Sequence, residues 1–292
     1  MISCNLMGGL GNQLFQIAAA LAYSLQYDIY CIFPYSEELT IGQPRPTYWN
    51  TFLLELKPYT THCSNHSSIT NTSLFNLPKY NEPSFQYRPI PQYNDFMLHG
   101  YFQSYKYFEK YQSDIFNIIR IEAHQYTIKQ EYPQYFAENN EKIISIHFRL
   151  GDYKHKQEFH PVLPYEYYEK SLQHLLSEII PLKELKEYTI LYCCEKEDNE
   201  HCLNIIHRLK DKFGIGIHQF MKVDDEIDDW KQLLIMSCCK INIIANSSFS
   251  WWAAYCNSYK DKVVIYPSIW FGYRIQNNVN DMYPPDWIKI TI

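Results

Sequence analysis

The sequence predicts an α/β fold with two domains, each built around a parallel sheet. Near the N-terminus, a short apolar run is followed by a glycine-rich loop and a helical pattern. From residue 142 onward, apolar runs alternate regularly with helical patterns, which is typical of a parallel sheet with helices on both faces. A polar stretch at 122–141 separates the two parts. We therefore expect nucleotide-binding-type domains at 1–138 and 139–292, with a cleft between them.

The first domain should open with a strand at residues 1–6, a loop at Met7-Gly-Gly-Leu-Gly-Asn-Gln13 and a helix from Leu14 to Leu25. Glycines let the backbone approach a ligand, and a helix N-terminus favours an anion or a sugar hydroxyl. Gly9 and Gly11 are therefore candidate ligand-binding residues.

The same loop disfavours a dinucleotide cofactor. After Gly9 and Gly11, the third glycine of the dinucleotide fingerprint is replaced by Leu14. A nicotinamide-dependent oxidoreductase is accordingly the weakest of the functions considered.

The rest of the first domain is less regular. Residues 29–33 resemble a second strand, whereas eight prolines interrupt residues 34–95 and the polar tract at 60–76 reads as a loop or insertion. A strand starting at Met97, a turn, and a helix at 107–121 should follow.

The second domain shows the clearer pattern. Apolar β-branched runs predict strands, and segments with helical spacing predict the helices between them. The expected helices are 165–177, 197–213, 229–238 and 249–256, and the expected strands are 142–146, 188–194, 215–220, 240–245 and 263–266.

Polar residues follow the first strand of this second domain. His147, Arg149 and Asp152 come where the run at 142–146 ends, and Gly151 lets the backbone turn. Ligands bind at the carboxyl ends of strands in open α/β sheets. The planar guanidinium of Arg149 can bind two phosphate oxygens at once. An ion pair between Arg149 and Asp152 that only locks the loop is an equally good interpretation.

A second loop repeats this arrangement. The strand at 240–245 ends at Asn246, and Ser247 and Ser248 fall where the next helix begins. Serine hydroxyls and the first backbone N–H groups of a helix can hold phosphate oxygens. Taken alone, an ordinary serine N-cap explains the same residues.

Composition limits the possible partners and location. The net charge of -6 and the lack of a basic run argue against general nucleic-acid binding. Nine cysteines without paired metal-ligand spacing indicate buried thiols in a reducing compartment. No segment has the roughly 18 apolar residues needed to cross a bilayer. We expect a cytoplasmic or membrane-peripheral protein.

Four segments together resemble one family. In chain order they are Gly8-Gly-Leu-Gly-Asn-Gln-Leu-Phe-Gln16, Gly100-Tyr-Phe-Gln-Ser104, His147-Phe-Arg-Leu-Gly-Asp-Tyr153 and Asn246-Ser-Ser-Phe-Ser-Trp-Trp252. They resemble the α-1,2-fucosyltransferases of glycosyltransferase family 11. The resemblance implies a GT-B architecture of two facing Rossmann-like domains. It also implies GDP-fucose as donor, inversion at the anomeric carbon, a glycan acceptor that contains galactose, and no obligatory metal or cofactor.

The resemblance also implies roles for individual residues. Arg149 would clamp the diphosphate, and His147 would lie against the base or ribose. Phosphate would contact Ser247, Ser248 and Phe249, while Asn12 would face the reacting sugar or the acceptor. Asp152 is a candidate general base, although orienting Arg149 is at least as good a role for it.

Two departures from the family pattern leave the donor open. Gln232 stands where relatives carry an acid suited to guanine, and a glutamine can both donate and accept. The segment at 192–195 ends Cys-Cys-Glu where Ser-Asp-Asp is common. Another nucleotide-deoxysugar, such as a nucleotide-linked rhamnose, is therefore an alternative donor. A glycan-binding module without transfer activity is the alternative from another class.

The acidic run at 224–229 lacks a strict Asp-x-Asp and precedes a helix, so it predicts no metal site.

Overall fold

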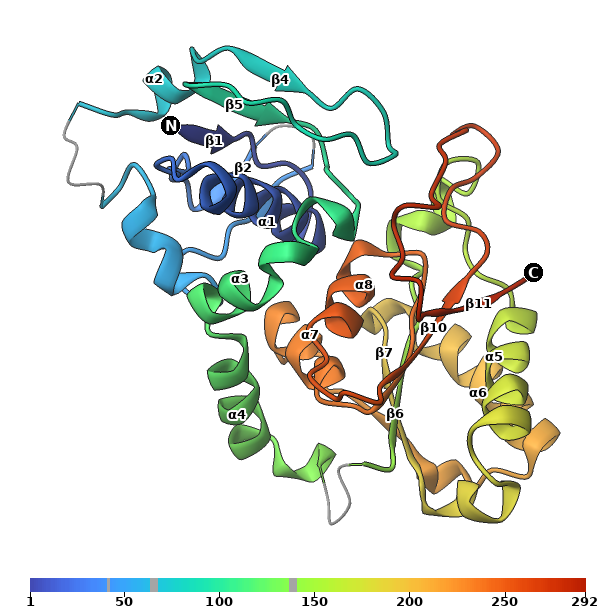
Figure 1. The fold of residues 1–292 in the computed structure, drawn as a ribbon. Helices are drawn as coiled ribbons and strands as arrows, with labels where there is room; N and C mark the ends of the chain where they lie inside the picture. Colours follow the sequence, from blue (N-terminus) through green and yellow to red (C-terminus); the bar gives the residue numbers. More distant parts are fainter. Residues whose placement is uncertain (41–42, 64–67, 137–140) are drawn as a thin grey trace. The chain divides into compact units, whose positions relative to one another are not determined.

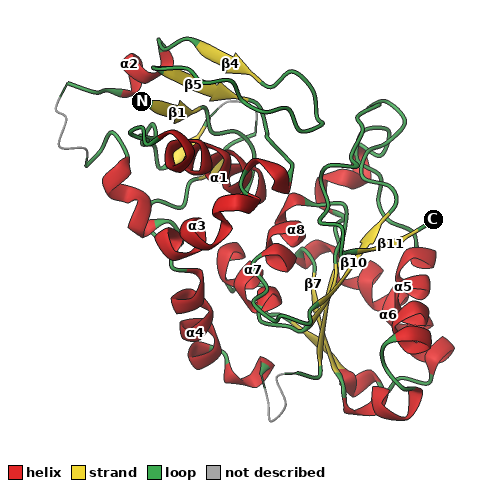
Figure 2. Ribbon diagram, in the orientation of Figure 1, coloured by secondary structure: helices red, strands yellow, loops and turns green. Residues whose placement is uncertain are grey.

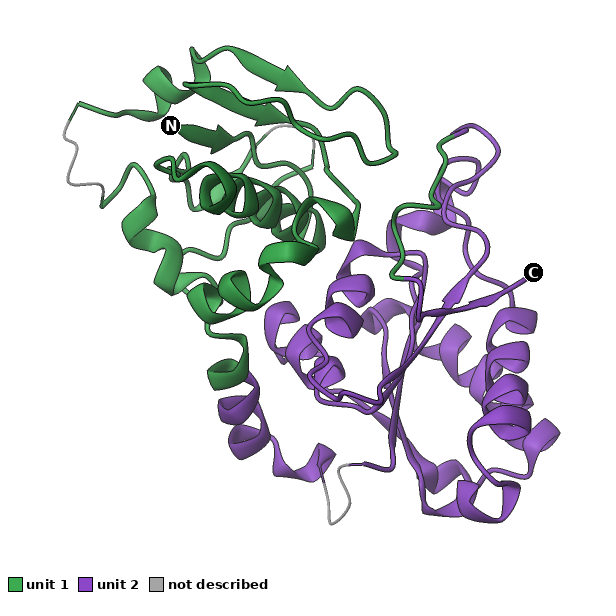
Figure 3. Ribbon diagram, viewed as in Figure 1, with its two compact units in different colours: residues 1–124, 277–284 green, residues 125–276, 285–292 purple. Residues whose placement is uncertain are grey.

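The computed structural model describes residues 1–40, 43–63, 68–136 and 141–292 (Figure 1). They form a mixed α/β structure with parallel sheets (Figure 2). Contacts divide the chain into two compact units (Figure 3). Unit 1 holds Met1–His124 and Asn277–Pro284, and unit 2 holds Gln125–Gln276 and Pro285–Ile292. The division falls inside α4 (Ile121–Glu131), whereas the predicted boundary between residues 138 and 139 lies outside the described residues.

Unit 1 is organised around a three-stranded parallel sheet. Its central strand, β5 (Phe96–His99), lies between β1 (Ile2–Cys4) and β4 (Lys79–Asn81). The buried helix α1 (Leu10–Tyr27) packs against β1. Because the three strands are parallel, the loops that follow them leave from the same edge of the sheet.

Two predictions for the start of unit 1 need correction. Helix α1 begins at Leu10 and not at Leu14, so Gly11 and Asn12 lie in its first turn. Gly9 is the N-cap, and only Gly8, with φ +76°, needs the left-handed backbone that favours glycine. The expected strand at 29–33 is reduced to isolated bridges of Cys31 and Phe33.

The irregular middle of unit 1 contains more structure than the prolines suggested. Strands β2 (Glu38–Leu39) and β3 (Arg45–Pro46) form a short antiparallel pair, and α2 (Asn71–Phe75) lies within the tract expected to be a loop. The helix expected at 107–121 is replaced by two 3₁₀ turns and α3 (Gln112–Ile119). Arg120 adopts φ 59°, and this left-handed residue separates α3 from α4.

Unit 2 contains a six-stranded parallel sheet in the order β11-β10-β9-β6-β7-β8. Helices α5 and α6 lie on one side of this sheet, and α7 and α8 lie on the other (Figure 1). The strands are β6 (Ile143–His147), β7 (Thr189–Cys193), β8 (Phe220–Lys222), β9 (Ile241–Ile243), β10 (Val263–Pro267) and β11 (Ile288–Ile290). The helices are α5 (Tyr165–Glu178), α6 (Asn199–Phe213), α7 (Asp229–Ser237) and α8 (Ser248–Tyr255).

The predicted alternation of strands and helices in unit 2 is confirmed, with two exceptions. The strand expected at 215–220 is a 3₁₀ turn at Ile217–Gln219 that leads into the short strand β8. Strand β11 was not predicted at all. Within the described ranges, no helix combines the length and the apolar character that crossing a membrane requires.

Candidate functional site

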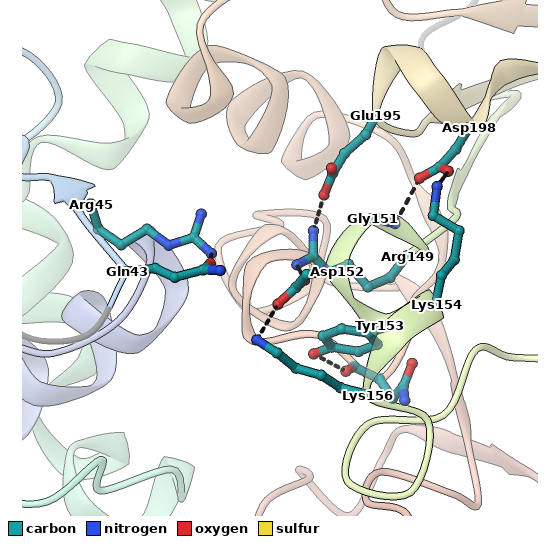
Figure 4. A network of polar contacts seen from close by, with 11 residues as sticks. Gln43, Arg45, Arg149, Gly151, Asp152, Tyr153, Lys154, Lys156, Glu195 and Asp198 are labelled. Atoms are coloured by element: carbon teal, nitrogen blue, oxygen red, sulfur yellow. Dashed lines mark hydrogen bonds and ion pairs between the residues drawn. The ribbon is translucent and has the colours of Figure 1, made fainter.

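A cluster of charged side chains surrounds Arg149, which follows β6. Its guanidinium pairs with two carboxylates, those of Glu195 and Asp152 (Figure 4). It also lies over the ring of Tyr153, 4.7 Å from the ring centroid. Glu195 reaches Arg149 because β6 and β7 are neighbours, with His147 in register with Cys193. The predicted ion pair between Arg149 and Asp152 is therefore present, and it is one half of a larger cluster.

The turn after Arg149 depends on Gly151. This residue has φ +41°, which a side chain rarely adopts, and a Cβ at its position would overlap the Glu195 carboxylate. The Gly151 N–H donates a 2.7 Å hydrogen bond to Asp198, which also pairs with Lys154. The prediction that glycine lets the backbone turn here is confirmed.

His147 is the last residue of β6 and is 7% exposed. Burial, and secondarily the nearby charge of Arg149, lowers the pKa of His147 to about 3. Its Nδ1 has no hydrogen-bond partner within the described residues, and its ring centroid lies 5.4 Å from that of Phe249. At neutral pH this side chain can therefore bind a ligand only as an uncharged imidazole.

The start of α8 lies beyond β9, which pairs with β6 in the sheet. Ser247 is the N-cap residue, but its hydroxyl makes no capping hydrogen bond. Ser250 takes part instead, because its Oγ accepts from the Ala245 N–H and donates to the Ser247 carbonyl. The simpler interpretation of Ser247 as an ordinary serine cap is therefore wrong. Its hydroxyl and that of Ser248 stay candidates for a phosphate.

Tyr153 connects these two loops. Its ring lies under the Arg149 guanidinium, and its hydroxyl donates to the Asn246 carbonyl at 3.2 Å. The amide of Asn246 donates in turn to the carbonyls of Pro161 and Trp270. Arg149 and the start of α8 are thus linked through one tyrosine at the carboxyl edge of the sheet, where ligands bind in this fold class.

Gln232 lies in α7, which packs against α8. Its Nε2 donates to the Ile227 carbonyl at 2.7 Å. Its side-chain oxygen therefore faces away from that carbonyl. An oxygen acceptor at this position offers the hydrogen-bonding capacity that an acid would offer.

The glycine segment of unit 1 is a second cluster, and it is neutral. Asn12 accepts a 2.7 Å hydrogen bond from Gln103, and Gln16 donates to the Gly100 carbonyl at 3.0 Å. The segments Gly8–Gln16 and Gly100–Ser104, which were far apart in the sequence, therefore lie together. A Cβ on Gly9 would meet open space, whereas Gly11 is buried inside α1.

Several contributors to the charged cluster were not predicted as site residues, namely Glu195, Tyr153, Asp198 and Lys154. Glu195 was noticed only as a departure from the family pattern, and its reach to Arg149 depends on the pairing of β6 with β7. No group of three or more histidine, cysteine or acidic residues within the described ranges could hold a metal ion. In the acidic run at 224–229, Asp225 forms an ion pair with Lys222.

The chain belongs to glycosyl transferase family 11, whose family model matches residues 1–291. Two Escherichia coli relatives match over nearly all of their length. The O-antigen biosynthesis glycosyltransferase WbnK is 26% identical, with 99% of this chain and 100% of the relative covered. An alpha-1,2-colitosyltransferase is 28% identical, with 99% of each chain covered.

A solved structure supports the fold assignment. The glycosyl transferase family 9 protein from Veillonella parvula aligns with a TM-score of 0.52 over 99% of this chain and 86% of its own, at 10% identity. The predicted GT-B fold class is confirmed. The protein is accordingly a glycosyltransferase, which requires a nucleotide-sugar donor and a glycan acceptor.

Proposed function

We propose that the protein transfers fucose, or a closely similar deoxysugar, from a GDP-sugar to a galactose-containing glycan and forms an α-1,2 linkage. One observation carries the proposal: an arginine and a serine hydroxyl that makes no capping hydrogen bond lie on two loops that Tyr153 joins at one edge of the sheet in unit 2. Family membership and the alpha-1,2-colitosyltransferase relative support the type of sugar and linkage.

The reaction follows from the charges that develop. The bond between the anomeric carbon and the donor phosphate breaks, and its electron pair stays on the leaving phosphate. Arg149 and the first N–H groups of α8 would stabilise this negative charge where it develops, which lowers the barrier. The acceptor hydroxyl attacks from the opposite face, so the anomeric configuration inverts, and its proton is lost to a base. Fixed positive charge of this kind makes a divalent cation unnecessary.

Asp152 is better suited to orienting Arg149 than to accepting that proton. One of its oxygens pairs with Arg149 and the other with Lys156, at 3.3 Å. Both Asp152 oxygens therefore already contact cations, a geometry that suits orienting Arg149. Glu195 supports the guanidinium from the other side. These contacts use only part of the five-donor fork of arginine, so donors are left for phosphate oxygens.

A second donor is supported by the relative that transfers colitose, a fucose-like sugar. A donor that carried colitose on the same nucleotide would differ from GDP-fucose only in the sugar, so Gln232 and Arg149 would serve both. Competition between GDP-fucose and GDP-colitose at equal concentration separates the two possibilities. A thermal-shift series with GDP, UDP and dTDP tests the base, because a ligand that binds the folded state raises Tm.

The test of the proposed function is incubation with GDP-fucose and a galactose-terminated acceptor in EDTA. We expect transfer, with an α-1,2 product and inverted configuration by NMR. Absence of both transfer and donor hydrolysis, together with GDP binding by Arg149→Lys equal to that of the unchanged protein, would refute it. Glycan binding without any nucleotide binding would instead identify a glycan-binding module.

A further inference from the structure

A carboxylate in unit 1 holds the turn that follows β5. Glu82 comes directly after β4, and its Oε2 accepts hydrogen bonds from the backbone N–H groups of Tyr101 at 2.8 Å and Phe102 at 3.0 Å. Its own backbone N–H donates to the His99 carbonyl at 2.9 Å. One residue therefore binds both sides of this turn.

The turn needs such support because its backbone is unfavourable. Phe102 has φ +53°, a left-handed conformation that is rare for an aromatic residue. Its ring is fully buried against Tyr80 and Tyr107. A Cβ on Gly100 would overlap the Cβ of Glu82, so the glycine leaves the room that the glutamate fills.

The same turn positions the polar cluster described above. Gln103 follows Phe102 directly and donates to Asn12, and Gln16 holds the Gly100 carbonyl. A change in the conformation of Phe102 would move Gln103, and Asn12 would lose its partner. Glu82 is not itself part of this pair, and its Oε1 is shielded from solvent without a hydrogen-bond partner among the described residues.

We propose that Glu82 is a positioning residue for sugar transfer, which acts by fixing the Gly100–Gln103 turn and through it the side chain of Asn12. The inference rests on the proposed function and on the role that the family resemblance implies for Asn12, which is to face the reacting sugar or the acceptor. A displacement of about 1 Å in a positioning group can cost about 100-fold in rate. The GDP site in unit 2 contains none of these residues.

The experiment compares Glu82→Ala, Glu82→Gln and the exposed control Glu122→Ala. In Glu82→Ala we expect kcat for transfer to fall at least about tenfold, with Kd for GDP within twofold of the unchanged protein. Glu82→Gln retains an oxygen that can accept both N–H groups, so it should restore kcat to within about threefold. Glu122→Ala should match the unchanged protein. Wild-type kcat in Glu82→Ala would overturn the proposal.

Hydrogen exchange at the Tyr101 and Phe102 amides gives a readout that needs no substrate. Exchange should be at least about tenfold faster in Glu82→Ala and nearly unchanged in Glu82→Gln. If Glu82→Ala does not fold, Glu82→Asp replaces it, because the shorter aspartate side chain cannot reach both amides. Equal exchange rates in Glu82→Asp and Glu82→Gln would then overturn the proposal. If the protein uses no GDP-sugar at all, the proposed function is refuted. The exchange result would still decide whether Glu82 fixes the turn.

Discussion

The carboxyl edges of the two parallel sheets carry different chemistry. In unit 2, Arg149 lies among the carboxylates of Glu195 and Asp152, close in sequence to Lys154 and Lys156. In unit 1, the corresponding edge carries amide side chains that bond to one another and to the backbone, and its Glu82 carboxylate accepts from two backbone N–H groups. Charges suit a diphosphate, whereas neutral amides suit sugar hydroxyls. This difference supports our proposal that the nucleotide binds in unit 2 and that the sugar or the acceptor binds in unit 1.

The largest expected effect follows replacement of the cation in unit 2. Arg149→Lys keeps the charge but loses the planar fork, so we expect kcat/KM for transfer to fall about 100-fold or more. Initial rates with GDP-fucose and a galactoside acceptor measure this. The exposed Arg208→Lys is the matched control. A loss no greater than that of the control would mean that Arg149 only locks its loop.

The second effect concerns stability at low pH. The pKa of His147 is about 3 in the folded protein, well below that of an unfolded histidine near 6.5. The unfolded chain therefore binds a proton that the folded one does not, and stability is lost as pH falls below about 6.5. Between pH 7 and pH 5 this contributes about 2 kcal/mol. Urea unfolding of His147→Asn should show a correspondingly weaker pH dependence, and an identical one would contradict the depressed pKa.

The third prediction concerns Asn12, in the amide cluster of unit 1. If Asn12 faces the reacting sugar or the acceptor, Asn12→Ala should lower kcat about tenfold, because a neutral positioning group is lost, while Kd for GDP stays within twofold. Steady-state kinetics and titration calorimetry measure the two quantities. Equal losses in GDP affinity and transfer would remove the distinction between the two edges.

The smallest effect is expected at Gln232. If its amide oxygen accepts a hydrogen bond from guanine, Gln232→Glu should strengthen GDP binding about threefold relative to UDP, because an ionised acceptor bonds more strongly. Calorimetry with both nucleotides measures the ratio. An unchanged ratio would place Gln232 outside the base site.

The sequence predicted unit 2 far better than unit 1. Strands β6, β7 and β9 are short β-branched runs buried on both faces, and such runs have a clear local signature. Strand β11 has three residues and is recognisable only from its pairing with β10. In unit 1, the left-handed conformation of Arg120, which ends α3, has no signal in residue type.

The candidate site shows the same limit. Arg149, Asp152 and Ser247 could be identified because they follow predicted strands directly. Glu195 and Glu82 become visible only when strands pair, since each acts on a loop that follows a neighbouring strand. The clue available in advance was a glycine opposite each of them, at Gly151 and Gly100, where the missing Cβ leaves room for the carboxylate side chain.

The most direct test is calorimetric titration of GDP, in EDTA, into the unchanged protein, Arg149→Ala and Asn12→Ala. We expect Arg149→Ala to raise Kd at least about tenfold, because a charge-assisted contact to phosphate is lost, whereas Asn12→Ala should leave Kd within twofold. The opposite pattern, with GDP lost from Asn12→Ala and retained by Arg149→Ala, would contradict the assignment of the nucleotide to unit 2.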